Sequence, residues 1–482
     1  MGRLSNVFKK FPRTFWVANT IELFERWAWY GFFMLFANYL TGSSDAGGLE
    51  FTQSQKGMIM GIGTGILYFL PVITGAIADR YGFKRVLIVA FSIYTSAFIL
   101  LPMFDTFTGV FIMYLYLALG AALFKPVISA TIAKTTNNET SSIGFGIFYM
   151  MVNLGAFLGP MVTLLFKNAS YDMVFHISAG IIALNFILLF FYKEPDRETT
   201  KEGFFDTIKN VFKNIGLVLV DFKFVIFLLI VSGFWTMYNQ LFFTLPVFIA
   251  QWVDTSNMYN YFAEYMPFIA ENYGTNGQME AEFITNFDAM FIILFQIIIS
   301  SLVMKWKPLG TMVTGFIVSS IGMALTLLTQ NVMFIMVALF IFAIGEMTAS
   351  PKITEYIGRI APRNKKALYM GYSFIPLFLG NIFAGFISGD VYQQLSDKHT
   401  ILMREVEKRG LSISKELSHN EYFSNAAEQM DMSQRELTNY LWQQYNPSNI
   451  WIVIFAIGIF AALSLWFYNR FLMKNPNLTV EN

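Results

Sequence analysis

Long apolar runs separated by short polar stretches recur along the whole chain. Each run has about 20 residues, enough for an α-helix to cross the hydrocarbon core of a bilayer. The runs are continuous, whereas the strands of a membrane β-barrel alternate between apolar and polar residues. The pattern therefore predicts an all-α membrane protein with twelve transmembrane helices. The expected spans cover residues 14–40, 54–79, 84–103, 107–134, 142–167, 174–193, 224–252, 286–305, 308–329, 332–361, 366–393 and 448–474.

A polar stretch in the middle of the chain divides these spans into two sets of six. We expect an N-terminal six-helix bundle at residues 1–193, a cytoplasmic linker at 194–223 and a C-terminal six-helix bundle at 224–482. Two halves with the same number of helices are typical of transporters built from repeats.

Two polar segments of the second half, 254–282 and 394–447, lie outside the spans. The first is acidic, and the second contains amphipathic patches at 401–417 and 426–445. We expect short helices that lie over the outer mouth. Disordered loops are the alternative, because loops of this length are often disordered.

Lysine and arginine predict the orientation, because they are enriched in short loops on the cytoplasmic side. The short outer loops keep only Lys56 and Lys167 when both termini are placed in the cytoplasm. The basic residues then assigned to the cytoplasm are Arg3, Lys9, Lys10, Arg13, Arg80, Lys84, Arg85, Lys134, those of 193–223, Lys305, Lys307, Arg359, Arg363, Lys365, Lys366, Arg470 and Lys474. With no cleavable signal peptide recognised, we interpret the chain as a multi-pass protein of the bacterial inner membrane, both termini cytoplasmic.

Composition narrows the class of function. Charged residues make up 13% of the chain, about half of the usual share in soluble domains. The net charge of +1 argues against a nucleic-acid partner. The chain has no cysteine, and its histidines, His176, His399 and His419, lie near a helix mouth or in a polar segment. We therefore expect no metal site, no cofactor and no enzymatic activity.

Three charged residues lie in the middle of the first span. Glu22, Glu25 and Arg26 share one helix face with Trp29, at spacings of three, four and seven residues. Ionisable groups are costly at this depth, so they usually face a protein interior or a water-filled path. We interpret them as functional, with a structural ion pair as the alternative.

Other charges at membrane depth are few. Lys125 in span 4 needs a carboxylate partner, and Glu22 or Glu25 is the expected one. Glu346 in span 10 has no obvious partner, which suits a proton acceptor or a site for the ammonium group of a ligand; a structural hydrogen bond is the alternative. Asp288 lies near the start of span 8. Polar residues that fit a water-lined cavity are Tyr30, Tyr68, Asn153, Trp235, Asn239, Gln240 and Ser350.

Several motifs carry a resemblance to known families. The sequence GAIADRYGFKR at 75–85, with Asp79, Arg80 and Arg85, resembles the cytoplasmic signature of the major facilitator superfamily. The sequence ELFERWAWYG at 22–31 resembles the ExxER motif of the proton-dependent oligopeptide transporter family. Further motifs that resemble those of this family are FKP at 124–126, FYMMVNLG at 148–155, FWTMYNQ at 234–240 and GEMTASP at 345–351.

The resemblance implies an alternating-access symporter that imports di- and tripeptides with protons. It implies a proton-linked system of Glu22, Glu25 and Lys125, joined by Glu346. The peptide carboxylate would face Arg26, Lys125 and Asn153, and its amino group would face Glu346. The polar residues of the expected cavity complete our prediction of the substrate-binding site: Tyr30, Tyr68, Trp235, Asn239 and Ser350. The resemblance to the major facilitator superfamily implies that Asp79, Arg80 and Arg85 serve gating. The implied partners are small peptides, protons and the bilayer, with the monomer as the functional unit.

Four positions depart from the pattern of the oligopeptide transporter family. Trp29 replaces the first tyrosine of a pair, Val127 replaces an asparagine, and Asn239 replaces the usual acid of span 7. Asp288 stands where span 8 often has asparagine, so we hypothesise that it shares the coupling role with Glu346; the alternative is an N-cap. These departures leave two other interpretations open: a transporter of a non-peptide amphipathic or anionic solute, and a receptor-like relative that has lost transport.

Overall fold

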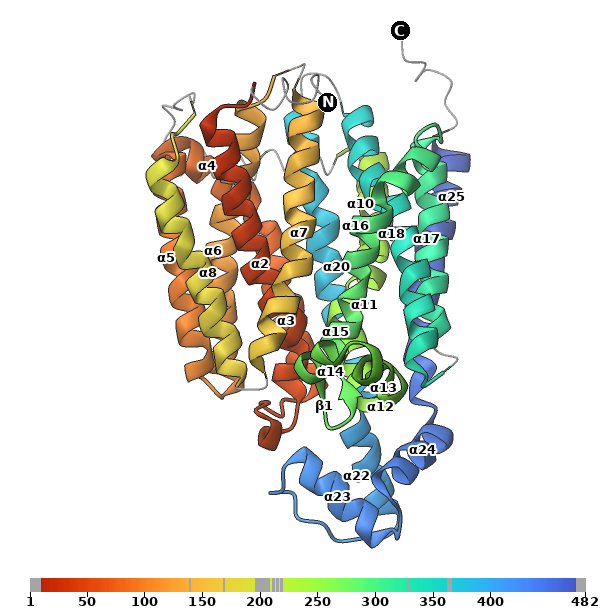
Figure 1. The fold of residues 1–482 in the computed structure, drawn as a ribbon. Helices are drawn as coiled ribbons and strands as arrows, with labels where there is room; N and C mark the ends of the chain where they lie inside the picture. Colours follow the sequence, from red (N-terminus) through yellow and green to blue (C-terminus); the bar gives the residue numbers. More distant parts are fainter. Residues whose placement is uncertain are drawn as a thin grey trace.

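The computed structural model describes residues 10–137, 140–167, 170–195, 220–326, 329–361 and 366–473, and the isolated positions 209, 213 and 216. Most of the expected linker and the basic residues Arg3, Lys9, Arg363, Lys365 and Lys474 lie outside these residues. The described chain is almost entirely helical, and its long helices run side by side (Figure 1).

The first half consists of six long spans, the second of which is bent. α3 (Gln53–Phe69) and α4 (Pro71–Tyr81) are joined at an angle of 43°, where Pro71 begins α4. The other spans are α2 (Arg13–Thr41), α5 (Phe83–Leu100), α6 (Phe107–Lys134), α7 (Ser141–Lys167) and α8 (Tyr171–Phe191), with short 3₁₀ turns η1 (Ser44–Ala46) and η2 (Leu101–Met103).

The second half repeats this plan with more interruptions. Its seventh span is broken at Asn239 and Thr244 into α10 (Phe222–Tyr238), α11 (Gln240–Phe243) and α12 (Leu245–Trp252). The eleventh consists of α19 (Lys366–Gly371), η5 (Tyr372–Phe374), α20 (Ile375–Phe386), η6 (Ile387–Val391) and α21 (Tyr392–Leu395). The others are α16 (Phe287–Val303), α17 (Pro308–Leu325), α18 (Val332–Ile360) and α25 (Ile450–Phe467), which continues into η8 (Tyr468–Leu472).

Among the described residues, ten helices are long and apolar enough to cross a membrane, or eleven when the bent pair counts as one span. α2 is long enough, with 29 residues, but it is not among these helices because it carries Glu22, Glu25 and Arg26 and is therefore less apolar. The all-α membrane class predicted from the apolar runs is confirmed.

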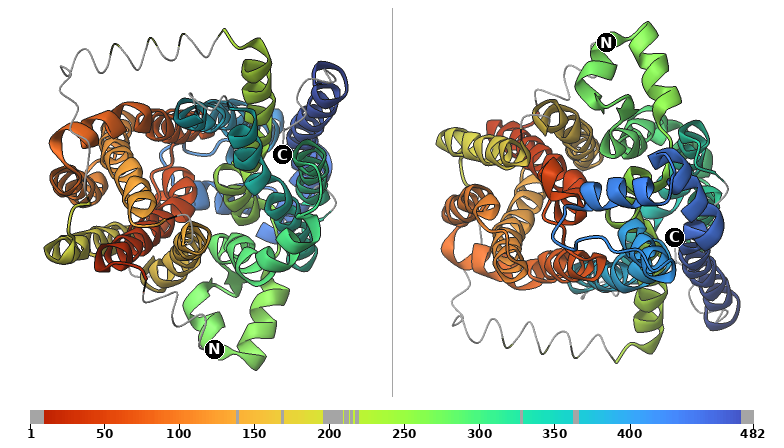
Figure 2. Two further views of the ribbon diagram at one scale, coloured as in Figure 1. Left: turned by 90° about the horizontal axis from the view of Figure 1, so that it is seen from above. Right: turned by 90° about the horizontal axis from the view of Figure 1, so that it is seen from below.

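Short helices cover one end of the molecule, which we call the outer end in accordance with the orientation expected from the basic residues. The first outer segment forms α13 (Ser256–Tyr265), α14 (Pro267–Tyr273), the hairpin of β1 (Gly274–Thr275) and β2 (Gln278–Met279), and α15 (Ala281–Thr285). The second forms α22 (Lys398–Lys408), α23 (His419–Gln429) and α24 (Gln434–Tyr445), which we call the cap. The expectation of short helices is confirmed, and the alternative of disordered loops is wrong for both segments. The cap projects beyond the spans (Figure 1), and the view from below shows it across the middle of the molecule (Figure 2).

The outer parts of the two halves touch through a seam of glycines, formed by Gly57 and Gly61 on α3 and Gly385 and Gly389 on α20 and η6. A Cβ atom at Gly57 would lie 2.2 Å from the carbonyl oxygen of Gly385, and one at Gly61 would lie 2.8 Å from the Cα atom of Gly385. Small residues allow membrane helices to approach with their backbones in contact. The seam therefore brings the two halves into direct backbone contact at the outer end.

At the inner end, the turn between α4 and α5 contains a single residue, Gly82, with φ of 102°. L-residues with a side chain rarely adopt this conformation, which explains the glycine of the signature motif. Glu194 accepts hydrogen bonds from the backbone N–H groups of Phe83 at 2.9 Å and Lys84 at 3.4 Å. A carboxylate at a helix N-terminus stabilises it, so Glu194 ties the end of the first half to this turn.

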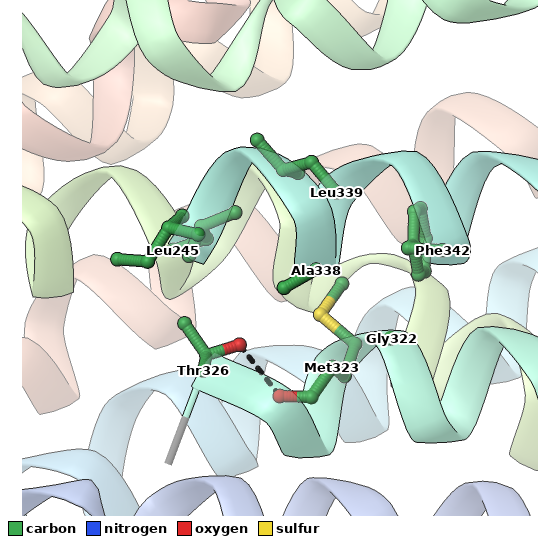
Figure 3. A pocket seen from close by; sticks show the side chains of 8 residues that line it. Leu245, Gly322, Met323, Thr326, Ala338, Leu339 and Phe342 are labelled. Carbon is green, nitrogen blue, oxygen red and sulfur yellow. Dashed lines mark hydrogen bonds between the residues drawn. The ribbon is translucent and has the colours of Figure 1, made fainter. Parts of the chain in front are cut away.

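A small pocket in the second half is a packing gap rather than a ligand site (Figure 3). Its lining is mostly apolar and includes Leu245, Met323, Leu339 and Phe342. The hydroxyl of Thr326 donates to the Met323 carbonyl oxygen at 2.6 Å and is thereby satisfied. The pocket has no free polar group that could orient a ligand.

Candidate functional site

Arg26 lies between two carboxylates of its own helix. Its Nη2 donates to Glu25 Oε1 at 2.7 Å, and its Nε lies 3.3 Å from Glu22 Oε1. The hydroxyl of Tyr94 on α5 donates to Glu25 Oε1 at 2.9 Å. All three charged side chains are buried, and Glu25 is fully so. A buried charge needs such partners, and removing one of them is strongly destabilising.

The two aromatic residues that follow this cluster have different surroundings. Trp29 is buried, and its ring stacks on Phe33 with the centroids 5.1 Å apart. Tyr30 lies with its ring centroid 5.8 Å from the guanidinium of Arg26 and approaches Phe242 of the second half at 6.2 Å. Trp29 therefore packs inside the first half, whereas Tyr30 faces the boundary between the halves.

Lys125 does not pair with Glu22 or Glu25 in this structure, contrary to expectation. Its Nζ lies 4.7 Å from the centre of the Tyr68 ring. Among the described residues, no carboxylate lies within ion-pair distance of Lys125. The two expected partners, Glu22 and Glu25, pair with Arg26 instead. The ammonium is thus left with the face of an aromatic ring, which attracts a cation without neutralising it.

Glu346 on α18 and Asp288 on α16 lie next to each other, with the Tyr238 hydroxyl beside Glu346. Glu346 Oε2 and Asp288 Oδ1 are buried and have no hydrogen-bond partner among the described residues. The N-cap of α16 is Asn286, and Asp288 lies in the first turn, so the alternative that Asp288 is the N-cap is wrong. Two buried carboxylates with free oxygen atoms form an acidic pair that could hold a proton or a cationic group.

The remaining predicted residues lie at the break of span 7 or on the facing helices. Asn239 is buried between α10 and α11, and its Nδ2 has no acceptor among the described residues. Trp235 is half-buried and packs edge-on against Tyr238, with the centroids 5.0 Å apart. Asn153 donates to the Tyr149 carbonyl oxygen of its own helix at 2.8 Å, and Ser350 is half-buried one turn beyond Glu346.

Two tyrosines bring the halves of the site together. Tyr30 lies near Arg26 on its own helix and near Glu346 of the second half. Tyr149 on α7 lies near Glu346 and Asp288. Two residues of the first half are therefore close to the acidic pair of the second half. Tyr149 was not predicted as a site residue, although it lies in the sequence motif that contains Asn153.

The outer side is closed by two lysines that the sequence had placed in loops. Lys56 is fully buried on α3, and its Nζ donates to the Phe243 carbonyl oxygen of the second half at 2.8 Å. Lys167 on α7 lies 2.6 Å from Glu280 and 3.4 Å from Glu282. Both lysines thus join the two halves, and the assignment to loops is wrong. The acidic residues just before span 8 are the signal that could have predicted the partner of Lys167.

Further contacts extend this closure toward the cap. Asn38 Nδ2 on α2 donates to Glu282 Oε1 at 2.9 Å, and the backbone N–H of His419 on α23 donates to Glu50 Oε1 at 2.8 Å. Burial raises the pKa of the Glu50 carboxyl, but hydrogen bonds from the N–H groups of Ser44 and His419 outweigh this effect and hold the pKa below its ordinary value. Glu50 therefore remains charged at neutral pH.

The predicted gating residues lie at the inner end of the first half. Asp79 and Arg85 are exposed, and the guanidinium of Arg80 lies 5.6 Å from the centre of the Tyr81 ring. Their role in gating stays a prediction.

Comparison with known proteins places the chain in a family of transporters. The family model described as Major Facilitator Superfamily matches residues 19–385. A Na(+), Li(+), K(+)/H(+) antiporter of Planococcus maritimus is 20% identical over 350 residues, 70% of this chain and 81% of its own. A di-/tripeptide transporter of Lactococcus lactis subsp. lactis (strain IL1403) is 24% identical over 199 residues, 40% of this chain and 39% of its own.

The fold is also similar to solved structures. The crystal structure of a POT family transporter in complex with 5-aminolevulinic acid has a TM-score of 0.70 and 17% sequence identity, and the match covers 95% of this chain and 96% of that one. The similarity confirms the fold that the sequence predicts.

Proposed function

The chain belongs to the major facilitator superfamily, and on this basis we propose that it is a proton-coupled symporter that imports di- and tripeptides. The peptide binds between the two halves, with its carboxylate towards Arg26 and Lys125 and its amino group towards Glu346. The transporter fold and the peptide transporters among its relatives support the general function. The proposed protonation sites and the direction of the peptide rest on the charged residues of this chain.

The observation that carries the proposal is the separation of opposite charges across the boundary between the halves. Lys125 lies over the ring of Tyr68 and has no carboxylate within ion-pair distance among the described residues, whereas Glu346 and Asp288 have carboxylate oxygens without a donor among those residues. The carboxylate of a zwitterionic peptide can pair with Lys125, and its ammonium group can pair with Glu346 and Asp288. Because these residues belong to different halves, a bound peptide links the halves electrostatically.

The acidic pair gives proton coupling a physical basis. Two adjacent carboxylates are more stable with one proton between them than with two negative charges. Asn239 stands at the span-7 position that is acidic in the oligopeptide transporter family. We therefore assign the coupling role to Asp288 and Glu346 together, with Glu22 and Glu25 as a second proton-linked group.

In the proposed cycle, a proton and a peptide bind together and favour closure of the outer side. After release to the inside, Lys125 pairs with Glu22, which expels the proton and resets the first half. Thermodynamic linkage requires that peptide and proton favour the same state, typically by about 1–3 kcal/mol. Asp79, Arg80 and Arg85 take part in the corresponding movement at the inner end.

Uptake of dialanine by proteoliposomes, with and without an inward proton gradient, tests the proposal. We expect accumulation above the external concentration only when the gradient is present. Equal uptake under both conditions would exclude proton coupling, and absence of uptake with specific binding would identify a receptor-like protein.

Replacing Asp288 by Asn is expected to lower proton-driven uptake of dialanine about tenfold, while peptide exchange without a gradient continues. The amide keeps the shape but cannot accept the shared proton, and a tenfold change corresponds to a coupling free energy of about 1.4 kcal/mol, within the usual range. Initial uptake rates at several external pH values measure the effect. Asp105→Asn, at an exposed position, serves as the control. Wild-type coupling in Asp288→Asn would contradict the role of this residue.

A second candidate function keeps the fold and changes the cargo. The same charge separation would bind a non-peptide zwitterion or another amphipathic or anionic solute, and a solved POT family structure contains 5-aminolevulinic acid. Competition between labelled dialanine and a panel of amino acids, amino acid derivatives and organic anions separates the two candidates.

We propose the bacterial inner membrane as the location, with both termini in the cytoplasm and a functional monomer. The positions of the basic residues support this orientation. Reactivity of single cysteines introduced at exposed positions of the cap and of the α4–α5 turn, in intact cells, tests it.

A further inference from the structure

A large cavity lies between the cap and the outer ends of the spans. Its volume is about 990 Å³, at the upper end of the usual range for ligand pockets. Asn38 and Thr41 of α2 lie at one side, Gln251 and Trp252 of α12 line its wall, and Lys398 of α22 reaches it from the cap. Both halves and the cap therefore contribute to its lining.

The cavity contains the amino group of Lys398, whose pKa is lowered to about 7 by burial, so that the amine is partly protonated at neutral pH and a bound anion would stabilise its charged form. The Nζ of Lys398 lies 4.3 Å from the centre of the Phe423 ring and 5.6 Å from that of Trp252. No carboxylate among the described residues lies within ion-pair distance of this ammonium. The fully charged side chains of the lining are Arg435 and Asp254, which pair with each other at 2.8 Å. The local balance thus favours an anion.

The neighbouring groups fit the polar end of a small solute. The rings of His399 and His419 stack at 3.8 Å beside Lys398, and both line the cavity. Gln251 and Asn420 add amide groups, while Trp252 and Phe423 offer apolar faces. Such a combination of a few polar groups with aromatic walls is typical of small-molecule sites.

The position of the cavity relates it to the path of the cargo. Asn38 both lines the cavity and donates to Glu282, one of the contacts that close the outer side. Arg26 lies on the same helix, and the rise from position 38 to position 26 is about 18 Å at 1.5 Å per residue. The cavity is therefore immediately outside the closure, on the same helix as the central site.

We propose that this cavity is a second, outer ligand site that binds the carboxylate of a small peptide through Lys398 while the outer side is closed. Lys398 supplies the charge, and Trp252 and Phe423 hold its ammonium in place without neutralising it. The site would keep a peptide at the entrance until the outer seam opens. The identity of the ligand rests on the proposed peptide transport, but occupancy of the cavity does not depend on transport.

The natural absence of cysteine allows a direct test. An environment-sensitive fluorophore on a single cysteine at Asn439, which lines the cavity, reports binding of dialanine to the purified protein. We expect a saturable signal that dialanine amide does not produce, because the amide lacks the carboxylate. Lys398→Gln should weaken the apparent affinity at least about tenfold, as expected for loss of a charged hydrogen bond. Lys398→Arg should restore most of it.

Two control variants locate the signal. Lys125→Gln removes the cation of the central site and should leave the signal at Asn439 intact, whereas Lys415→Gln, an exposed lysine of the cap region, should have no effect. Loss of the signal in Lys125→Gln, or an unchanged affinity in Lys398→Gln, would overturn the outer site. A Lys398-dependent signal in a protein that does not accumulate dialanine would support the outer site and contradict the proposed transport. Uptake of dialanine without any signal at Asn439 would support the transport and contradict the outer site.

Discussion

Replacing Lys125 by Ala is expected to abolish proton-driven accumulation of dialanine, so that the internal concentration rises only to about the external one. In the structure, the ammonium of Lys125 has the Tyr68 ring beside it and no carboxylate partner among the described residues. It is therefore available to the peptide carboxylate in one state and to Glu22 in another. Without this cation, neither interaction can form, and binding of the peptide is no longer linked to release of the proton. Proteoliposome uptake under a proton gradient measures the effect.

Two variants make the result on Lys125 specific. Lys125→Arg keeps the charge and should retain measurable accumulation, and Lys305→Ala, at an exposed position of the inner end, should behave as wild type. Concentrative uptake by Lys125→Ala would contradict the assignment of this residue.

Valine at position 57 is expected to hold the outer side open and stop transport. Its Cβ would lie 2.2 Å from the Gly385 carbonyl oxygen and 2.7 Å from the Gly389 Cα atom, so α3 and α20 would have to separate. Overpacking of this kind costs about 1–3 kcal/mol, which shifts a two-state equilibrium about 5- to 150-fold away from the closed form. Spin labels on cysteines at Met58 and Gln394, on the two sides of the seam, should report a longer distance.

Gly180 on α8 supplies a matched control for the glycine seam. A Cβ atom at Gly180 would meet nothing within 4 Å, so Gly180→Val should leave both the distance and the uptake unchanged. An unaltered distance distribution in Gly57→Val would show that the seam is not what closes the outer side.

The sequence predicted features that depend on one helix or one local motif. The spacing of Glu22, Glu25 and Arg26 placed these charges on one face, and the structure shows them in contact. Asp288 and Glu346, for which the sequence suggested a shared role, lie next to each other on helices that pack together, and the role itself stays a prediction. The structure does not contain the expected pair of Lys125 with Glu22, since the carboxylate already has a guanidinium on its own helix. Whether Glu22 pairs with Arg26 or with Lys125 depends on distances between helices, which helix periodicity does not predict.

Features that join distant segments could not be predicted in the same way. The contact of Gly57 with Gly385 depends on the relative height of two helices from different halves. Lys56 was placed in a loop, although it binds a carbonyl group at the break of span 7. The pattern of charged side chains in a sequence does not indicate which backbone carbonyl group a lysine will bind. The amphipathic patches predicted the cap helices, but the cavity beneath them follows only from their position over the spans.

The local pairing on α2 also bears on how the chain enters the membrane. A charged residue at the centre of a helix costs about 2.5–3.5 kcal/mol during insertion by the translocon, and α2 carries three of them. Arg26 has Glu25 beside it and Glu22 one turn earlier, so the helix contains the counter-ions of this cluster, whose net charge is only −1. This local pairing lowers the cost of inserting the first span into the membrane before its neighbours are present. Lys125, whose aromatic partner Tyr68 belongs to another span, becomes stable at depth only after that span is present.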